Sequence, residues 1–522
     1  MSIVKRSTGV VLDLDLGVEI VEVGSAPRTP SARGLRRSKG PSPIPGASVA
    51  EAVVEGLADL QVVVVDSFDV VGTGGARVGL NLAGAEVAVV LLERDGLYNW
   101  VYPERRPGTL PSKALQFEVG SASARRRRMR GGILELVADR VRAYVFKFVA
   151  RLAAKAALKA LESRRKEGLV LMSGAPADWH LVDRAKKLGL PRDRGARLLL
   201  FIHGAFSSTR GDFGGLGLSE LGAAWLAGAG QNYDAILGYD HRTLTADPLE
   251  NAADLAARLA QLTDAPEVDV VGFSRGALVV RSLVELLPPE AWSGRVRKAV
   301  LVGSPNAGTT LADPDRWEHL ADLYTNLASL GCNALRMIAP ASPAAAMLKE
   351  SVSSVAAFVT YLASVSLDRR VAPGLAALSP DGGFLARLNR VRRSACDYYL
   401  VQSDFDLQLL ARDPAERAFP RRLALWLLDV LADAFMGAPN DLVVETASMA
   451  TGLEDLAKGR LRFGRKQQVH HWAYFTRPEL LEKLERWLDQ RTTGRRRRAR
   501  EQECTGPAAP SSSPPFGACR EG

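Results

Sequence analysis

The stretch VDVVGFSRGALVVRSLVELL, residues 268–287, decides the fold. Its first six residues are apolar apart from Asp269 and do not alternate, which is typical of a buried parallel strand. Residues 277–287 predict a helix that Pro288 and Pro289 end. Gly-x-Ser-x-Gly at 272–276 joins the two, so Ser274 lies on a sharp turn from strand to helix. Gly272 and Gly276 support this elbow, because larger side chains would collide with the neighbouring strand and helix.

A second apolar strand, LLLFI at residues 198–202, runs directly into His203-Gly204-Ala205. In chemistry at Ser274, a backbone N–H from this loop could bind a developing oxyanion together with the N–H that follows the serine. We expect Ala205 and Arg275 to supply these two N–H groups. His203 and Gly204 would shape the loop.

A serine hydroxyl attacks a carbonyl only when a neighbouring base takes its proton. Asn440-Asp441-Leu-Val-Val444 supplies a carboxylate 167 residues after Ser274, and His470-His471 follow 30 residues later. We predict Ser274 as nucleophile, His471 as base and Asp441 as the group that orients it. His470 remains the alternate base, because adjacent side chains diverge and only one can reach the serine. Alternative acids are Glu445, Asp404 and Asp406.

These segments together resemble the α/β-hydrolase superfamily, in the lipase-like branch that includes bacterial triacylglycerol lipases and GPI-inositol-deacylase-like proteins. VGSPNAGT at 302–309 is similar to that branch's T-P-H-x-G-S/T turn, and DLVV at 441–444 to its D-x-V-V segment. PGLAALSP at 373–380 with FLARLN at 384–389 resembles its P-G-L and L-N segment, and HHWAYF at 470–475 favours His471. Asn306 stands where a histidine is usual, and Arg275 is bulkier than many residues there. The resemblance implies an α/β-hydrolase fold, a mostly parallel sheet with helices on both faces and a helical cap.

At 522 residues the chain is too long for one ordinary core. We predict an N-terminal strand at 10–23 and a Pro/Ser-rich linker within 1–45, then an accessory α+β domain at 46–167. That domain would hold a helix at 48–59, strands at 61–68 and 86–93, and a long basic amphipathic helix at 134–161. The hydrolase domain would span 168–490 with a cap inserted at about 310–395. Residues 491–522 would be a disordered Arg/Pro/Ser-rich tail.

The formal net charge is +10, and two clusters of five arginines, at 125–130 and 495–500, account for all of it. The rest of the chain is nearly neutral, so no nucleic-acid partner is expected. The basic segments could contact an anionic membrane peripherally. Cys332, Cys396, Cys504 and Cys519 form no C-x-x-C pair, so we expect no metal, no cofactor and a reducing compartment, the cytoplasm. Asp13 and Asp15 interrupt the N-terminal apolar residues, so we expect no signal peptide, and no apolar run reaches about 18 residues.

The function indicated is a serine hydrolase of the lipase or esterase type, which cleaves carboxylic esters through an acyl-enzyme. Residues 310–395 are apolar and alanine-rich, which suits a hydrophobic or acyl ester substrate. Two alternatives stay open. The same scaffold hosts acyltransferases and thioesterases, and the chain could instead be an interaction or scaffold protein with a vestigial hydrolase fold.

Overall fold

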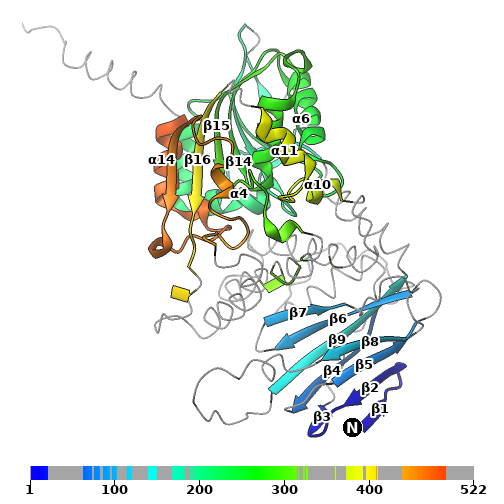
Figure 1. Ribbon diagram of the computed structural model, residues 1–522. Coiled ribbons are helices and arrows are strands. Elements are labelled where there is room, and N and C mark those ends of the chain that lie inside the picture. The colour runs from blue at the N-terminus through cyan, green and yellow to red at the C-terminus, as the bar shows by residue number, and fades with distance from the viewer. Residues whose placement is uncertain are drawn as a thin grey trace, which may run out of the picture.

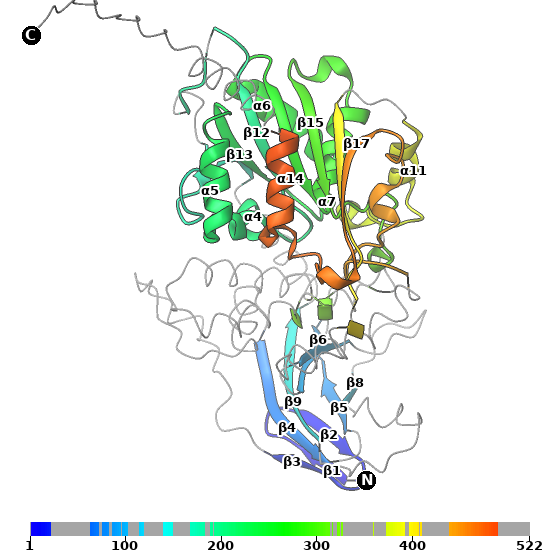
Figure 2. The same ribbon diagram turned by 90° about the vertical axis from the view of Figure 1, so that its left-hand side faces the viewer.

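A computed structural model gives the architecture of the protein (Figures 1 and 2). It describes residues 2–21, 63–102, 114–119, 139–149, 167–313, 372–406 and 438–488, with short gaps, and short pieces at 316–326, 359 and 408–409. In this part of the chain the strands form three sheets, of four, five and eight strands.

The eight-stranded sheet is the centre of the C-terminal part and has the order β11-β10-β13-β12-β14-β15-β16-β17. From β13 to β17 all neighbours are parallel, whereas β10 pairs antiparallel with β11 and β13. The strands are β10 Gly168–Leu171, β11 His180–Leu181, β12 Arg197–Ile202, β13 Ala235–Asp240, β14 Glu267–Phe273, β15 Arg295–Val302, β16 Asp397–Ser403 and β17 Ala457–Phe463.

Helices cover both faces of this sheet (Figure 2). Helices α4 Thr209–Leu218, α5 Glu220–Ala229 and α14 Pro478–Leu488 pack on one face, where Phe201 and Val271 point. Helices α6 Pro248–Leu262 and α7 Arg275–Arg281 pack on the other, where Leu200 and Val270 point. Successive residues of a strand therefore pack into the cores on opposite faces of the sheet. This explains why β12 and β14 are apolar without alternation.

The strand and helix predicted around Ser274 are confirmed. Strand β14 ends at Phe273, and α7 begins at Arg275 and continues as a π-helical turn over Ser282–Leu286, just before Pro288. The predicted strand at 198–202 is β12. Helix α6 starts as a capping box in which Asp247 accepts from Glu250 N–H and Glu250 accepts from Asp247 N–H.

The N-terminal part is an antiparallel β-sandwich in the residues described. One sheet has the order β1-β2-β5-β8 and the other β3-β4-β9-β6-β7, and their inner faces share one core. The strands are β1 Ser2–Lys5, β2 Val10–Leu14, β3 Val18–Val21, β4 Val63–Gly72, β5 Ala76–Asn81, β6 Glu86–Arg94, β7 Leu97–Val101, β8 Ala114–Val119 and β9 Asp139–Val149. The predicted strands at 61–68 and 86–93 correspond to β4 and β6.

Two predictions for this part are wrong. The amphipathic helix expected at 134–161 is a strand over residues 139–149, paired on both sides with β4 and β6. Val141, Val145 and Phe148 fit a helical spacing, but the stretch is rich in β-branched and aromatic residues, which favour a strand flanked by two others. The single strand expected at 10–23 is two strands, because the chain turns at Gly17, whose φ is 79°.

Other predicted elements lie outside the described residues. These are the linker up to residue 45, the helix at 48–59, the tail at 491–522 and most of the cap at 310–395. Near the end of the cap range, the structure describes α10 Pro373–Ala376 and α11 Gly383–Arg390. Among the described helices, none is both long and apolar enough to cross a membrane.

The N-terminal sandwich contacts residues 322–326, within the range predicted to be a cap, through the edge strand β7. Asp322 accepts a hydrogen bond from Trp100 N–H at 2.7 Å. The Asn326 amide accepts from Tyr98 N–H at 2.8 Å and donates to Tyr98 O at 2.6 Å. Backbone groups on the outer side of an edge strand are free to pair. The side chains of Asp322 and Asn326 thus occupy the place of a further strand.

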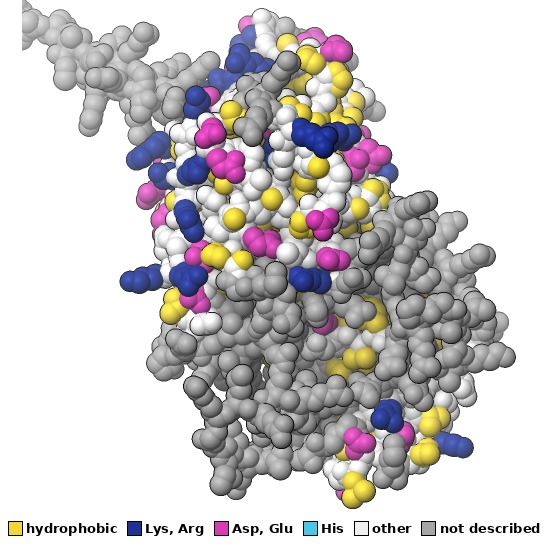
Figure 3. Space-filling model, viewed as in Figure 1, with side chains coloured by type: hydrophobic (Ala, Val, Ile, Leu, Met, Phe, Trp, Pro, Cys, Tyr) yellow, Lys and Arg dark blue, Asp and Glu magenta, His cyan; other side chains and the backbone are white. Residues whose placement is uncertain are grey.

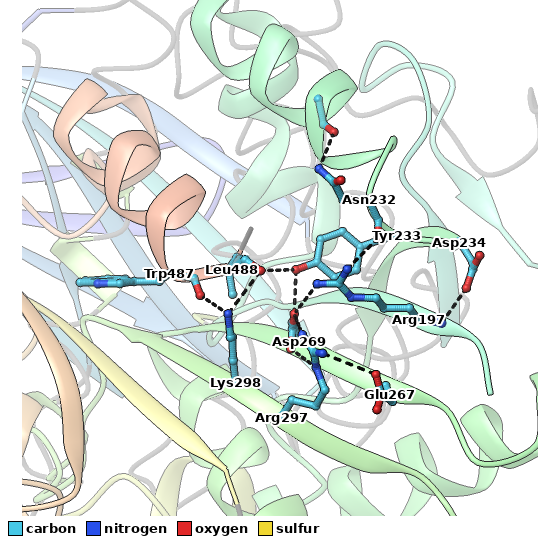
Figure 4. Close-up of polar contacts among 11 residues, drawn as sticks. Arg197, Asn232, Tyr233, Asp234, Glu267, Asp269, Arg297, Lys298, Trp487 and Leu488 are labelled. Atoms are coloured by element: carbon cyan, nitrogen blue, oxygen red, sulfur yellow. Dashed lines mark hydrogen bonds and ion pairs between the residues drawn. The ribbon is translucent and has the colours of Figure 1, made fainter. Parts of the chain in front are cut away.

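The last helix is held to the sheet by a buried polar cluster around Asp269 and Lys298 (Figure 4). Asp269 on β14 accepts from Tyr233 at 2.8 Å and from Arg297 at 2.9 Å. Lys298 donates at 2.6 Å to the carbonyl of Trp487 at the end of α14, and burial lowers the pKa of Lys298. This cluster fixes α14, whose start follows the segment that carries His470 and His471.

On the molecular face shown in Figure 3, Lys and Arg side chains of the described residues are interspersed with Asp and Glu. No broad basic surface gathers on this face of the C-terminal part.

Candidate active site

Ser274 occupies a strained turn at the carboxyl end of β14. Its φ and ψ are 52° and −126°, and its N–H donates to Val302 O at 2.8 Å. The two glycines of the motif are sterically required. A methyl group on Gly276 would lie 2.2 Å from Ile202 O, and one on Gly272 would lie 2.8 Å from Ala277 Cα. A residue that keeps such a backbone conformation does so because the surrounding structure holds it, and such positions cluster at active sites.

His471 and Asp441 form a buried pair. His471 Nδ1 donates to Asp441 Oδ2 at 2.7 Å, so the neutral ring carries its proton on Nδ1 and leaves Nε2 as an acceptor. The main chain repeats the pairing, because His471 N–H donates to Asp441 O at 2.9 Å. Asp441 Oδ1 accepts from Val444 N–H at 2.8 Å. An imidazole held in this way can take a proton at Nε2 while the carboxylate stabilises the resulting cation.

Tyr474 is a third member of this pair that the sequence analysis missed. Its hydroxyl donates to Asp441 Oδ2 at 2.8 Å, and burial together with Asp441 raises its pKa well above the ordinary value. Tyr474 therefore stays a neutral donor to the Asp441 carboxyl group. Its position three residues after His471 was the available signal, but only the folded chain shows its hydroxyl facing the carboxylate.

His471 packs against Phe273, the residue that precedes Ser274. The Phe273 and His471 rings are 4.8 Å apart between centroids. Within the residues that the structure describes, the Ser274 hydroxyl makes no hydrogen bond, including none to His471. Such bonds between nucleophile and base are often long before the substrate binds and shorten in the complex.

The alternate candidates do not join this arrangement. His470 packs edge-on against Phe405, its Nδ1 has no partner among the described residues, and burial lowers its pKa to about 4. Asp404 is paired with Arg465 at 3.2 Å. Asp406 caps the Gln408 N–H at 2.8 Å, and Glu445 accepts from Thr310 N–H at 3.3 Å. In the described part of the chain, none of these three carboxylates is hydrogen-bonded to His470 or His471.

The His-Gly loop lies directly against the serine. A methyl group on Gly204 would come within 2.9 Å of Ser274 Cβ and 3.4 Å of Ser274 Oγ. Gly204 N–H donates to Asp212 Oδ2 at 2.7 Å, and Phe206 N–H to Thr243 Oγ1 at 3.2 Å. The Ala205 N–H between them has no acceptor among the described residues. The loop thus leaves one free donor beside Ser274.

Asn306 is fully buried and joins several segments through hydrogen bonds. Its side chain accepts from Arg281 Nη1 at 3.3 Å and from Ser304 Oγ at 2.8 Å, and donates to Met449 O at 2.8 Å. Asn389 donates to the Asn306 carbonyl at 2.8 Å. The turn after β15 is therefore joined to α7, to α11 and to the loop that follows Asp441.

Among the residues described, no group of three or more His, Cys, Asp or Glu side chains could hold a metal ion. The histidines not assigned to chemistry take different places. His180 is exposed, whereas His241 is buried and stacks on His203 with 4.1 Å between ring centroids.

A mostly parallel sheet covered on both faces, with a serine elbow after one central strand and a carboxylate–histidine pair at the same edge, is the architecture of an α/β-hydrolase. The chain belongs to the family described as domain of unknown function (DUF7379), whose model matches residues 166–489. No curated protein matches the chain.

Three solved structures are distantly similar. The product of gene lin2722 of Listeria innocua is 14% identical, with 57% of this chain and 95% of that chain covered and a TM-score of 0.30. An α/β-hydrolase family protein of Desulfitobacterium hafniense is 14% identical, with 57% and 97% covered and a TM-score of 0.31. Lipase 1 of Pelosinus fermentans is 12% identical, with 56% and 99% covered and a TM-score of 0.30.

Proposed function

We propose that the protein is a serine hydrolase that cleaves carboxylic esters through an acyl-enzyme. The observation that carries the proposal is the buried hydrogen bond of 2.7 Å between His471 Nδ1 and Asp441, at the edge of the sheet where Ser274 occupies its strained turn. A histidine oriented by a carboxylate beside an elbow serine is the arrangement that activates a hydroxyl for acyl transfer.

In the proposed reaction, Ser274 Oγ attacks the ester carbonyl while His471 Nε2 takes the hydroxyl proton. Asp441 holds the ring and stabilises its charged form. The N–H groups of Ala205 and Arg275 bind the negative oxygen of the tetrahedral intermediate, which collapses when His471 protonates the departing alcohol. Water then attacks the acyl group with His471 again as the base, which releases the acid and restores Ser274.

An acyl ester with an apolar chain is the proposed substrate class, supported by the apolar composition of 310–395. A fluorophosphonate probe and a panel of p-nitrophenyl esters of increasing chain length test activity and substrate together. We expect the wild type to be labelled and to turn over at least one ester, and Ser274→Ala to lose both. Ser293→Ala is the control, because Ser293 is exposed and precedes β15, at the end of the strands opposite to Ser274. Labelling or turnover that survives Ser274→Ala would contradict the proposal.

A further inference from the structure

The peptide unit between Gly204 and Ala205 is fixed by hydrogen bonds. His203 Nδ1 donates to the carbonyl oxygen of this unit, Gly204 O, at 2.9 Å. In a trans peptide the C=O and the N–H point in opposite directions, and the described residues contain no cis peptide bonds. A carbonyl turned toward His203 therefore turns the Ala205 N–H away from it. The orientation of the candidate oxyanion donor is set by His203.

His203 is itself held in one tautomer. Gly204 O can only accept, so the neutral ring carries its proton on Nδ1, and Nε2 accepts from the backbone N–H of His241 at 3.3 Å and lies 3.8 Å from Asp240 Oδ1. The His241 ring stacks on the His203 ring with an interplanar angle of 24°. Both rings are almost fully buried. Rotation of His203 would break one of these bonds and disturb the stack.

His241 is held in turn by the side chain of Arg275. His241 Nδ1 donates to Tyr239 O at 3.1 Å, and Nε2 accepts from Arg275 Nη1 at 3.1 Å. Arg275 is fully buried, and burial lowers its pKa to about 10. Its other guanidinium contacts are the carbonyls of Ala246 and Gly374, at 2.5 Å and 3.4 Å. In the described part of the chain no carboxylate lies within ion-pair distance of it, and Asp247 and Glu250 act on its charge only at longer range.

Burial of an arginine without an ion pair costs folding free energy, which hydrogen bonds to its N–H groups offset only in part. Its backbone N–H is one candidate oxyanion donor, and its side chain reaches, through His241 and His203, the peptide that carries the other. We propose that His203, held through His241 by Arg275, is a positioning residue that orients the Ala205 N–H for oxyanion binding. This inference rests on the proposed function and deepens it, because both donors are then set from the same elbow residue.

The test compares three substitutions of His203 in the full-length chain, with p-nitrophenyl butyrate as the substrate. An asparagine amide nitrogen can lie near the position of Nδ1, whereas a glutamine amide nitrogen lies near Nε2. We expect H203L to lower kcat by about 100-fold or more while KM changes less than about threefold, because the bond acts on the transition state. H203N should recover at least about tenfold of this loss, and H203Q should not.

A second pair of variants covers the case in which H203L does not fold. H241Q keeps an acceptor for Arg275, whereas H241L removes it, so H241Q should retain a kcat at least about fivefold above that of H241L. Equal kcat values for H203N and H203Q, or for H241Q and H241L, would overturn the positioning role. So would a kcat of H203L within about threefold of the wild type.

The proposed function fails in a different way. A wild type that is not labelled by fluorophosphonate at Ser274, or whose turnover persists in Ser274→Ala, removes the proposed function and this inference with it. If turnover is lost in Ser274→Ala but kcat is unchanged by the His203 substitutions, only the inference is wrong.

Discussion

Asp441 and His471 are joined twice, by the side-chain bond of 2.7 Å from Nδ1 to Oδ2 and by the main-chain bond of 2.9 Å from His471 N–H to Asp441 O. The two residues are 30 positions apart and come from two loops at the same edge of the sheet. The side-chain bond fixes the tautomer and orientation of the His471 ring, and the main-chain bond fixes the backbone that carries it. Rotation of His471 about its side-chain bonds would therefore cost the charge-assisted bond without freeing the backbone.

The first prediction concerns the carboxylate of this pair. Asp441→Asn should lower kcat by about 10³ to 10⁴, because the amide neither enforces the tautomer nor stabilises the imidazolium. Steady-state kinetics on the best ester of the panel measures the effect. Asp404→Asn, at the carboxylate paired with Arg465, is the matched control and should change kcat less than about threefold. A comparable loss in both variants would show that Asp441 has no special role.

A second prediction concerns His470 and acid stability. Burial lowers its pKa to about 4 from an ordinary 6.5, so between these values the unfolded chain binds a proton that the folded chain does not. The stability linked to His470 is complete above pH 6.5 and is lost as the pH falls toward 4, by about 3 kcal/mol at most. His470→Gln should flatten this part of the stability profile in urea unfolding at pH 7, 6, 5 and 4.

The control for that experiment is His180→Gln, because His180 is exposed. It should follow the wild-type profile. His470→Gln should also keep turnover within about tenfold, since its ring does not contact Asp441. A loss of turnover as large as that of His471→Gln would instead identify His470 as the base.

A third prediction concerns the buried pair Arg281 and Glu285 on the elbow helix. Their side chains are 0% and 1% exposed and lie 2.8 Å apart. Arg281→Met should lower the free energy of unfolding by about 3 to 5 kcal/mol, because it leaves a buried carboxylate unpaired. The double variant Arg281→Met/Glu285→Leu should recover part of this loss.

Arg258→Met is the control, since Arg258 and Asp254 form a pair with the same helical spacing that is about one third exposed. Its cost should stay below about 1 kcal/mol. Urea unfolding of all variants gives the comparison. Similar costs at Arg281 and Arg258 would mean that the network around Asn306 does not depend on the arginine.

A fourth prediction concerns the contact between the N-terminal sandwich and residues 321–326. Asp322→Ala leaves the Trp100 N–H without its acceptor. Hydrogen exchange at the β7 amides should then speed up by about tenfold or more, because the edge strand opens without global unfolding. Asp193→Ala, at an exposed aspartate, should leave these amides unchanged. Unchanged exchange in Asp322→Ala would show that other contacts hold β7 in place.

Local pattern was enough to predict the strands around Ser274 in the eight-stranded sheet. Strands such as β12 and β14 are apolar on both faces and run into glycine-rich turns, so the position of Ser274 at the end of a central strand followed from sequence. For β9 the same kind of reasoning failed. Its apolar residues satisfy both a helical and a strand spacing, and the choice was made by pairing with β4 and β6, which no local pattern records.

The sequence by itself determined the strand–elbow–helix unit, the His-Gly loop and the order of Ser274, Asp441 and a histidine, because each depends on neighbouring residues and on turn geometry. Only the tertiary structure decided that His471 rather than His470 meets Asp441, and that Tyr474 does so too. It also decided that Arg275 reaches His241 and that Asn306 joins Arg281. These contacts connect residues from 25 to 34 positions apart, and such contacts exist only once the sheet has brought the loops to one edge.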